Sequence, residues 1–253
     1  MKSPSPQTLF LLSSFAALGT APAALISVNF RENNANANQI ILPTITAGGG
    51  AGVSALNWNN VTGSPGGPVT GLVDDVGSAT SAAVAWSSGG MWGDGTANTA
   101  ATAGNGNAQL LRGYLDDNQG SPPLPINITL TGIPFAEYDL VVYFSTDTTG
   151  GSYGTITATA ANGIKTGSTT GTKDTWGPSG TPASPGNPTL NDTNSLRITG
   201  LQGNLAILAP VRNGTTRHSI SGLQLIAIPE PGSFTLCGLA SLAWLGFRRR
   251  SRQ

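Results

Sequence analysis

Two aspartate doublets are the first residues whose type and spacing could do chemistry. Asp74-Asp75 follows the triplet Gly-Leu-Val, and Asp116-Asp117 follows Gly-Tyr-Leu. An enzyme that cleaves polysaccharides uses two carboxylates, one to protonate the leaving oxygen and one to attack or to activate water. Because neighbouring residues of a strand point to opposite faces, such a pair would need one aspartate from each doublet. The competing interpretation, polar turn residues, is the one we expect, so no catalytic residue is assigned.

The single histidine and the single cysteine restrict the other catalytic and metal chemistries. His218 has Ser219 and Ser221 beside it, too close along the chain to be natural partners in a catalytic triad, and no Gly-x-Ser-x-Gly motif occurs. We expect a structural role for this histidine. With Cys237 as the only cysteine, a zinc site built from several histidine or cysteine ligands is excluded.

A calcium site is a further possibility, which needs no catalytic residues. Asp116, Asn118 and Gly120 begin like a calcium-binding loop, but the twelfth position is Asn127 in place of the bidentate glutamate of an EF-hand. We therefore expect no cofactor, and a structural calcium ion stays possible without assigned ligands.

Tryptophans offer a binding chemistry. Trp86 and Trp92 lie in "WSSGGMWGDG", and exposed aromatic rings can stack on the apolar face of a sugar. Burial in a core is the commoner fate of large aromatic side chains. A carbohydrate-binding module with Trp86 and Trp92 at its site is therefore one alternative function.

The elements that must position these residues read as β-strands. Residues 25–31, "LISVNFR", alternate apolar and polar side chains and predict a half-buried strand, and residues 138–146, "YDLVVYFST", are a denser run typical of a central strand. Asn162-Gly163 separates two alternating runs and predicts a hairpin. Further strands are expected in "INITLTGI", "SLRITGL", "NLAILAPV" and "HSISGLQLIAI".

The fold class that follows is all-β, an antiparallel β-sandwich of the jelly-roll type. We expect the first strand to lie near the last, and we find no convincing amphipathic helix in the body. Three stretches look loosely ordered: Ala47–Gly52, Gly93–Asn107 and Gly177–Asn194.

Composition agrees with strands joined by many turns. Only 9% of the 253 residues are charged, while glycine (35) and proline (17) are plentiful. Residues 24–228 hold seven basic and eleven acidic side chains, so the body is mildly acidic. Nucleic-acid binding through a basic face is not expected.

Both ends of the chain carry targeting patterns. Lys2, an apolar run over 9–18 and an Ala-Pro-Ala site predict a signal peptide over 1–23, followed by a body over 24–228. Ser233 to Phe247 form an uncharged run whose helix would be about 22 Å long, a short transmembrane span. The arginines after it favour a cytoplasmic C-terminal end.

The tail over 229–253 resembles the PEP-CTERM sorting signal of Gram-negative bacteria. The matching residues are the triplet Pro229, Glu230 and Pro231, the short apolar stretch, and the basic stop Arg248, Arg249 and Arg250. This resemblance implies processing by an exosortase, a membrane-embedded cysteine peptidase. It also implies passage through the inner membrane to the cell surface or the extracellular matrix.

The body resembles jelly-roll domains of surface proteins from Verrucomicrobia and Planctomycetes, in "LISVNF", "LLRGYLDD", "GIPFAEYDLVVYFS" and "SGLQLIAI". Similar sequence stretches occur in galactose-binding-like modules, and this resemblance implies extracellular polysaccharide as a partner. The function expected from the sequence is therefore an exported surface or matrix protein that acts by display or interaction. The alternatives are the carbohydrate-binding module and, less favoured, a secreted polysaccharide-active enzyme.

Overall fold

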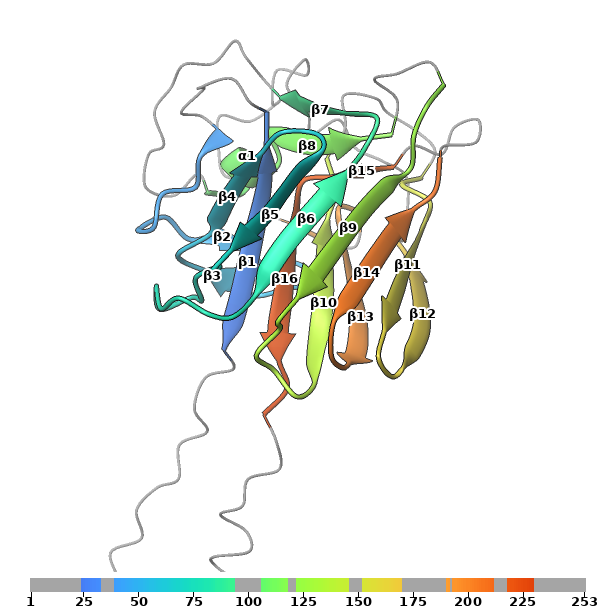
Figure 1. Cartoon of the computed structure of the whole chain (residues 1–253). Coiled ribbons are helices and arrows are strands. Elements are labelled where there is room, and N and C mark those ends of the chain that lie inside the picture. Colours follow the sequence, from blue (N-terminus) through green and yellow to red (C-terminus); the bar gives the residue numbers. More distant parts are fainter. Residues whose placement is uncertain are drawn as a thin grey trace, which may run out of the picture.

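The computed structural model describes residues 24–32, 39–93, 106–117, 122–145, 152–169, 190–191, 193–211 and 218–229. These residues form β-strands and one short helix, α1 (Gly106–Leu110). The all-β class expected from the sequence is confirmed, and Figure 1 shows two large sheets stacked one in front of the other.

The five-stranded sheet contains the two ends of the described chain. Its order is β13 (Ser195–Leu201), β10 (Tyr138–Tyr143), β16 (Gly222–Ala227), β1 (Leu25–Arg31) and β4 (Asn59–Thr62). The first strand pairs antiparallel with the last, as predicted. The expectation of a purely antiparallel sandwich is wrong at one pair, because β1 and β4 run parallel.

The six-stranded sheet lies in front of it in Figure 1. Its order is β12 (Gly163–Ser168), β11 (Thr155–Ala160), β14 (Leu205–Ala209), β9 (Ile126–Thr131), β6 (Ala83–Ser87) and β5 (Gly66–Thr70). All its pairs are antiparallel. The predicted hairpin is present: β11 and β12 pair up to Ala160 and Gly163, and Gly163 has a φ of 118°, which glycine adopts easily.

Two small sheets complete the fold. One joins β15 (Ser219–Ile220), β8 (Gly113–Asp116) and β7 (Gly90–Gly93), and the other joins β2 (Ala47–Gly48) and β3 (Ser54–Ala55).

The main core lies between the two large sheets. Alternate residues of the five-stranded sheet point inward, among them Ile26, Val28 and Phe30 of β1. They meet the inward residues of β9, Ile126, Ile128 and Leu130, whose outward neighbours are exposed. This clean alternation is what an antiparallel strand with one solvated face requires.

A second core covers the outer face of the five-stranded sheet. Residues 39–58, which we call the cap segment, contribute Ile41, Ile45 and Trp58 to it, and α1 contributes Leu110. These side chains bury residues of the sheet that point away from the main core: Leu25, Val141, Tyr143 and Ile226. Strand β10 is therefore buried on both faces, as its dense apolar run predicted.

The cap segment corrects one expectation. Ala47–Gly52 looked loosely ordered, yet it contains β2 and a turn that packs tightly on the sheet. A Cβ atom at Gly52 would lie 2.1 Å from the hydroxyl oxygen of Tyr143, so only glycine allows this approach. The glycines here permit close packing rather than disorder. Residues Gly106 and Asn107 of another such stretch begin α1, and most of the third lies outside the described residues.

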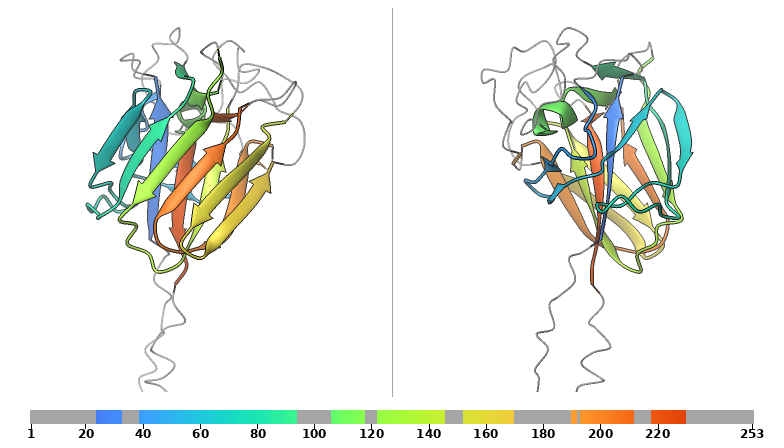
Figure 2. Two further views of the ribbon diagram at one scale, coloured as in Figure 1. Left: turned by 45° about the vertical axis from the view of Figure 1, so that its right-hand side comes forward. Right: turned by 90° about the vertical axis from the view of Figure 1, so that its left-hand side faces the viewer.

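Both ends of the described chain lie at the same end of the sandwich. The Ala227 N–H donates to the carbonyl of Ala24 at 2.9 Å, and Figure 2 shows β1 beginning where β16 ends. We call this the terminal pole. Within the described ranges no helix is long and apolar enough to cross a membrane. The predicted signal peptide, the span from Ser233 to Phe247 and most of the sorting signal lie outside those ranges.

Candidate functional site

The aspartate doublets lie at opposite ends of β1. At its start, the Leu25 N–H donates to Asp75 Oδ1 at 3.1 Å. The second doublet lies beyond the other end of β1. There the Phe30 N–H donates to the carbonyl of Ser221, and Ser219, two residues earlier, is the cross-strand partner of Asp116. Leu25 and Phe30 are five residues apart on β1, so the two regions are separated by roughly 17 Å. Glycosidase carboxylates are closer, at about 5–10 Å, so the doublets do not supply such a pair.

Asp74 has a turn-forming role. Its Oδ1 accepts the N–H groups of Val76, at 3.1 Å, and of Ser78, at 2.8 Å. A carboxylate that accepts from residues two and four positions ahead stabilises a tight turn. The expected interpretation as polar turn residues therefore holds for this doublet.

The other doublet is buried beside His218. Asp116 ends β8, and the Asp117 N–H donates to the carbonyl of His218 at 3.4 Å. In return the His218 N–H donates to Asp117 Oδ2, also at 3.4 Å, and Nδ1 of the imidazole lies 4.0 Å from that oxygen. This is a cross-strand pairing that joins the ends of β8 and β15.

Two buried serines of this region use their hydroxyls to bind main-chain carbonyls. The Ser219 hydroxyl donates to the main-chain carbonyl of Ser145, and the Ser145 hydroxyl donates to the carbonyl of Leu111. These hydroxyls hold loops to strands. The described residues contain no group of three His, Cys, Asp or Glu residues placed to hold a metal ion. Asn118 and Gly120 lie outside them.

The tryptophans do not form a shared platform. Trp86 is only 4% exposed, its ring packs edge-on against Phe30 at 5.5 Å, and its Nε1–H donates to the carbonyl of Gly63 at 2.6 Å. An enclosed ring has no free face for a sugar, so Trp86 does not fit the alternative of an aromatic sugar site. Trp92 is half-buried on β7, with its ring 5.7 Å from that of Tyr114.

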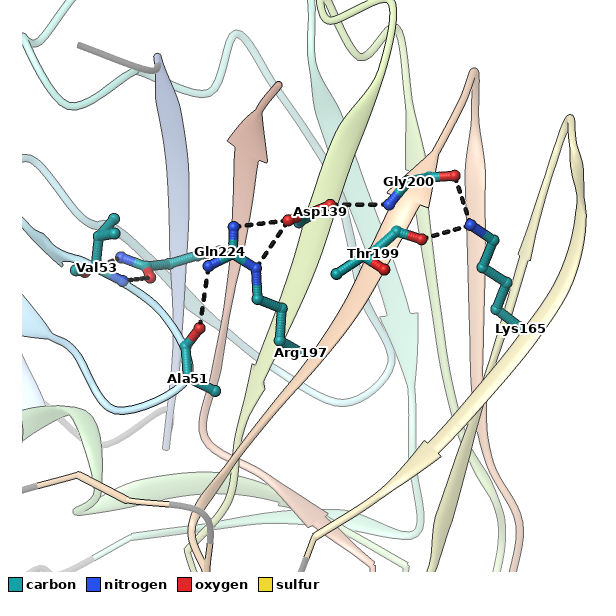
Figure 3. Close-up of polar contacts among 8 residues, drawn as sticks. All are labelled: Ala51, Val53, Asp139, Lys165, Arg197, Thr199, Gly200 and Gln224. Atoms are coloured by element: carbon teal, nitrogen blue, oxygen red, sulfur yellow. Dashed lines mark hydrogen bonds and ion pairs between the residues drawn. The ribbon is translucent and has the colours of Figure 1, made fainter. Parts of the chain in front are cut away.

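Charged residues at one side of the sandwich hold its layers together (Figure 3). The Arg197 Nε–H donates to Asp139 Oδ2 at 2.8 Å, and Nη1 reaches the carbonyl of Ala51 in the cap segment at 3.5 Å. Gln224 binds Val53 twice, accepting its N–H at 3.1 Å and donating to its carbonyl at 2.8 Å. These contacts fix the cap segment on the five-stranded sheet.

Lys165 does the same between the two sheets. From β12 its ammonium group donates to the carbonyls of Thr199 and Gly200 on β13, at 2.5 and 2.7 Å. A lysine placed at the side where two edge strands meet also discourages other chains from pairing there.

One surface without an assigned partner is the outer face of the six-stranded sheet, which faces the viewer in Figure 1. We call it the open face. Its outward side chains are uncharged and mostly small, mainly threonine and alanine. They are Thr70 on β5, Ala83, Ala85 and Ser87 on β6, Asn127, Thr129 and Thr131 on β9, Ala206 and Leu208 on β14, Thr155, Thr157 and Thr159 on β11, and Ile164, Thr166 and Ser168 on β12.

This surface was not predicted from the sequence, although its pattern is present there. The alternation in "INITLT" and "TITATA" puts threonine or asparagine on every outward position. What the sequence could not give is the strand order that places these runs side by side.

Compared with models of known protein families and with curated proteins, the chain matches none of them.

Proposed function

We propose that this is an exported bacterial protein of the cell surface or extracellular matrix, sorted and processed at its C-terminal Pro-Glu-Pro signal, that acts by display and interaction. The partner in sorting is an exosortase-type peptidase, and the tail passes through the inner membrane during that step.

The order of signals along the chain carries this proposal. The chain has, in the order that such sorting needs, an N-terminal export pattern, a Pro-Glu-Pro triplet, a short uncharged run and an arginine cluster. The position of the terminal pole supports it, because the tail beginning at Pro229 continues directly from the strand β16 that ends there. A body held by that tail would turn its other surfaces outward.

For the finer fold we propose the jelly-roll arrangement of galactose-binding-like domains, which the sequence resemblance suggested. Two stacked sheets, with the first and last strands paired, support it.

Mass spectrometry of surface material tests the processing step. The expected result is recovery of body peptides with no peptide beyond the Pro-Glu-Pro region. In a variant with Pro229, Glu230 and Pro231 all replaced by alanine, the tail peptide should persist in the membrane fraction. Ser233→Ala, a change beside the triplet that keeps it intact, is the matched control. Recovery of the sequence "FRRRSRQ" with the mature surface protein would refute processing.

A further inference from the structure

The open face is aligned in rows that cross five strands. Ser87, Asn127, Leu208, Thr157 and Thr166 are successive cross-strand partners and form one row. A second row runs through Ala85, Thr129, Ala206, Thr159 and Ile164. With neighbouring strands about 4.8 Å apart, each row is roughly 19 Å long.

Charge is missing from this surface. The six strands of the sheet contain one charged residue, Lys165. It pairs with Ala158, a residue of the main core, and its ammonium group binds carbonyls of the other sheet. Lys165 therefore does not belong to the open face. Surfaces that only meet water usually carry interspersed lysine, arginine, glutamate and aspartate.

A face of this kind selects its partner by charge. A nucleic acid or an acidic polysaccharide would bring anionic groups against a surface that offers no cation to pair with them. A neutral polymer has no such cost. Each threonine presents a hydroxyl group, which can donate and accept hydrogen bonds, beside a methyl group, which can pack against C–H groups.

A second copy of the chain fits less well. Homodimer interfaces are markedly apolar, whereas the only large apolar side chains of the open face are Leu208 and Ile164. The remaining outward residues are small or hydroxylated.

We propose that the open face binds a neutral polysaccharide, laid along the cross-strand rows, with Thr129 and Thr159 at its centre. These two residues flank Ala206 in the second row, and both are exposed. The proposal names the partner class for the interaction role above, and the binding it describes can be measured whether or not the protein is exported.

Affinity electrophoresis of the full chain in a non-ionic detergent tests it. Native gels contain dextran, galactomannan, xyloglucan or hydroxyethyl cellulose as neutral polymers, and alginate as the acidic one. We expect retardation by at least one neutral polymer and none by alginate. In the double variant Thr129→Lys with Thr159→Lys, the dissociation constant should rise at least tenfold. Thr44→Lys, an exposed threonine of the cap segment, is the matched control and should bind as the wild type does.

Two further variants separate binding from folding. Thr129→Ser keeps the hydroxyl and should retain most of the affinity, while all variants should keep the wild-type melting temperature. Failure of every neutral polymer to retard the chain would overturn the proposal, as would retardation by alginate alone or equal binding by the double variant. So would concentration-dependent dimerisation that the lysine pair abolishes, because the occupant would then be a second copy.

Discussion

The two large sheets bury their inner faces against each other, but their outer faces differ. The outer face of the five-stranded sheet carries Leu25, Val141, Tyr143 and Ile226, and the cap segment and α1 cover it. The outer face of the six-stranded sheet carries threonine, alanine and asparagine and lies open. The first face is part of the folding core, whereas the second is available to a partner.

The difference lies in the outward residue of each alternating pair. In β10 both members of the pair are apolar, so the strand needs cover on both sides. In β9 and β11 the outward member is threonine or asparagine, which satisfies the strand preference without demanding burial. The cap segment supplies the cover where it is needed.

The largest loss of stability should come from removing a cap-segment side chain that packs on the outer face of the five-stranded sheet. Trp58 packs against Tyr143 with ring centroids 5.9 Å apart, and its Nε1–H donates to the carbonyl of Ala55. We expect Trp58→Ala to lower the free energy of unfolding by about 3–5 kcal/mol, measured by urea denaturation. Ile164→Ala on the open face, where the side chain is 68% exposed, should change it by less than about 0.5 kcal/mol. Equal losses would mean that the two faces do not differ as described.

Alkaline pH should act on the buried tyrosines. Burial raises the pKa of Tyr138 to about 12, and burial also raises the pKa of Tyr143, although the charge of Arg197 partly opposes this. Because both folded pKa values lie above the unfolded value of about 10, the stabilisation is fully present below pH 10 and is lost as the pH rises toward 12. The urea midpoint should therefore fall above pH 10. A double variant, Tyr138→Phe with Tyr143→Phe, should flatten that fall, and an unchanged slope would contradict the assignment.

A smaller loss is expected from one hydroxyl of the second core. Tyr143 Oη lies 2.7 Å from Gln224 Oε1 and 3.2 Å from the carbonyl oxygen of Gly49. Tyr143→Phe leaves these buried acceptors without that donor and should cost about 1–2 kcal/mol in urea denaturation. Thr159→Val, which removes a hydroxyl from the open face, should leave stability nearly unchanged. If the valine variant loses as much, the open face also contributes to the fold.

The smallest effect on stability should come from Lys165. Its ammonium group is near the surface, so Lys165→Met should change the free energy of unfolding by less than about 1 kcal/mol. Without this charge, the edge strands β12 and β13 can pair with another chain more easily, and sedimentation velocity should then detect association. Lys165→Arg should sediment as the wild type does; association of both variants beyond that of the wild type would show that the charge is not what protects the edge.

Local patterns predicted much of the fold. The strands at residues 25–31 and 126–131, the dense run at 138–143 and the hairpin at Asn162-Gly163 all appear as expected. The half-buried pattern is right for 126–131 but wrong for 25–31, where the polar residues Ser27 and Asn29 are buried as well. The pairing of the first and last strands was also predicted correctly. The strands and the hairpin depend on periodicity and turn chemistry, which neighbouring residues determine, whereas the pairing of the first and last strands was expected from the closure of a sandwich.

Other features that depend on distant residues were not predictable. The parallel pairing of β1 with β4, the cap segment over the second core and the alignment of threonines across five strands each need the strand order. The burial of Trp86 could not be predicted for the same reason, because it depends on Phe30 and Gly63. The signal peptide and the sorting tail stay predictions.

Accessibility labelling on intact cells tests the whole account most directly. Cys237 is the chain's only cysteine, so Cys237→Ser leaves none, and Thr129→Cys or Thr44→Cys then adds one on the open face or on the cap segment. With a membrane-impermeant maleimide, we predict labelling at position 44 throughout, and labelling at position 129 only after neutral matrix polysaccharide has been removed enzymatically. If neither position is labelled, the protein is not exported. If both positions are labelled equally before the polysaccharide is removed, the open face is not occupied.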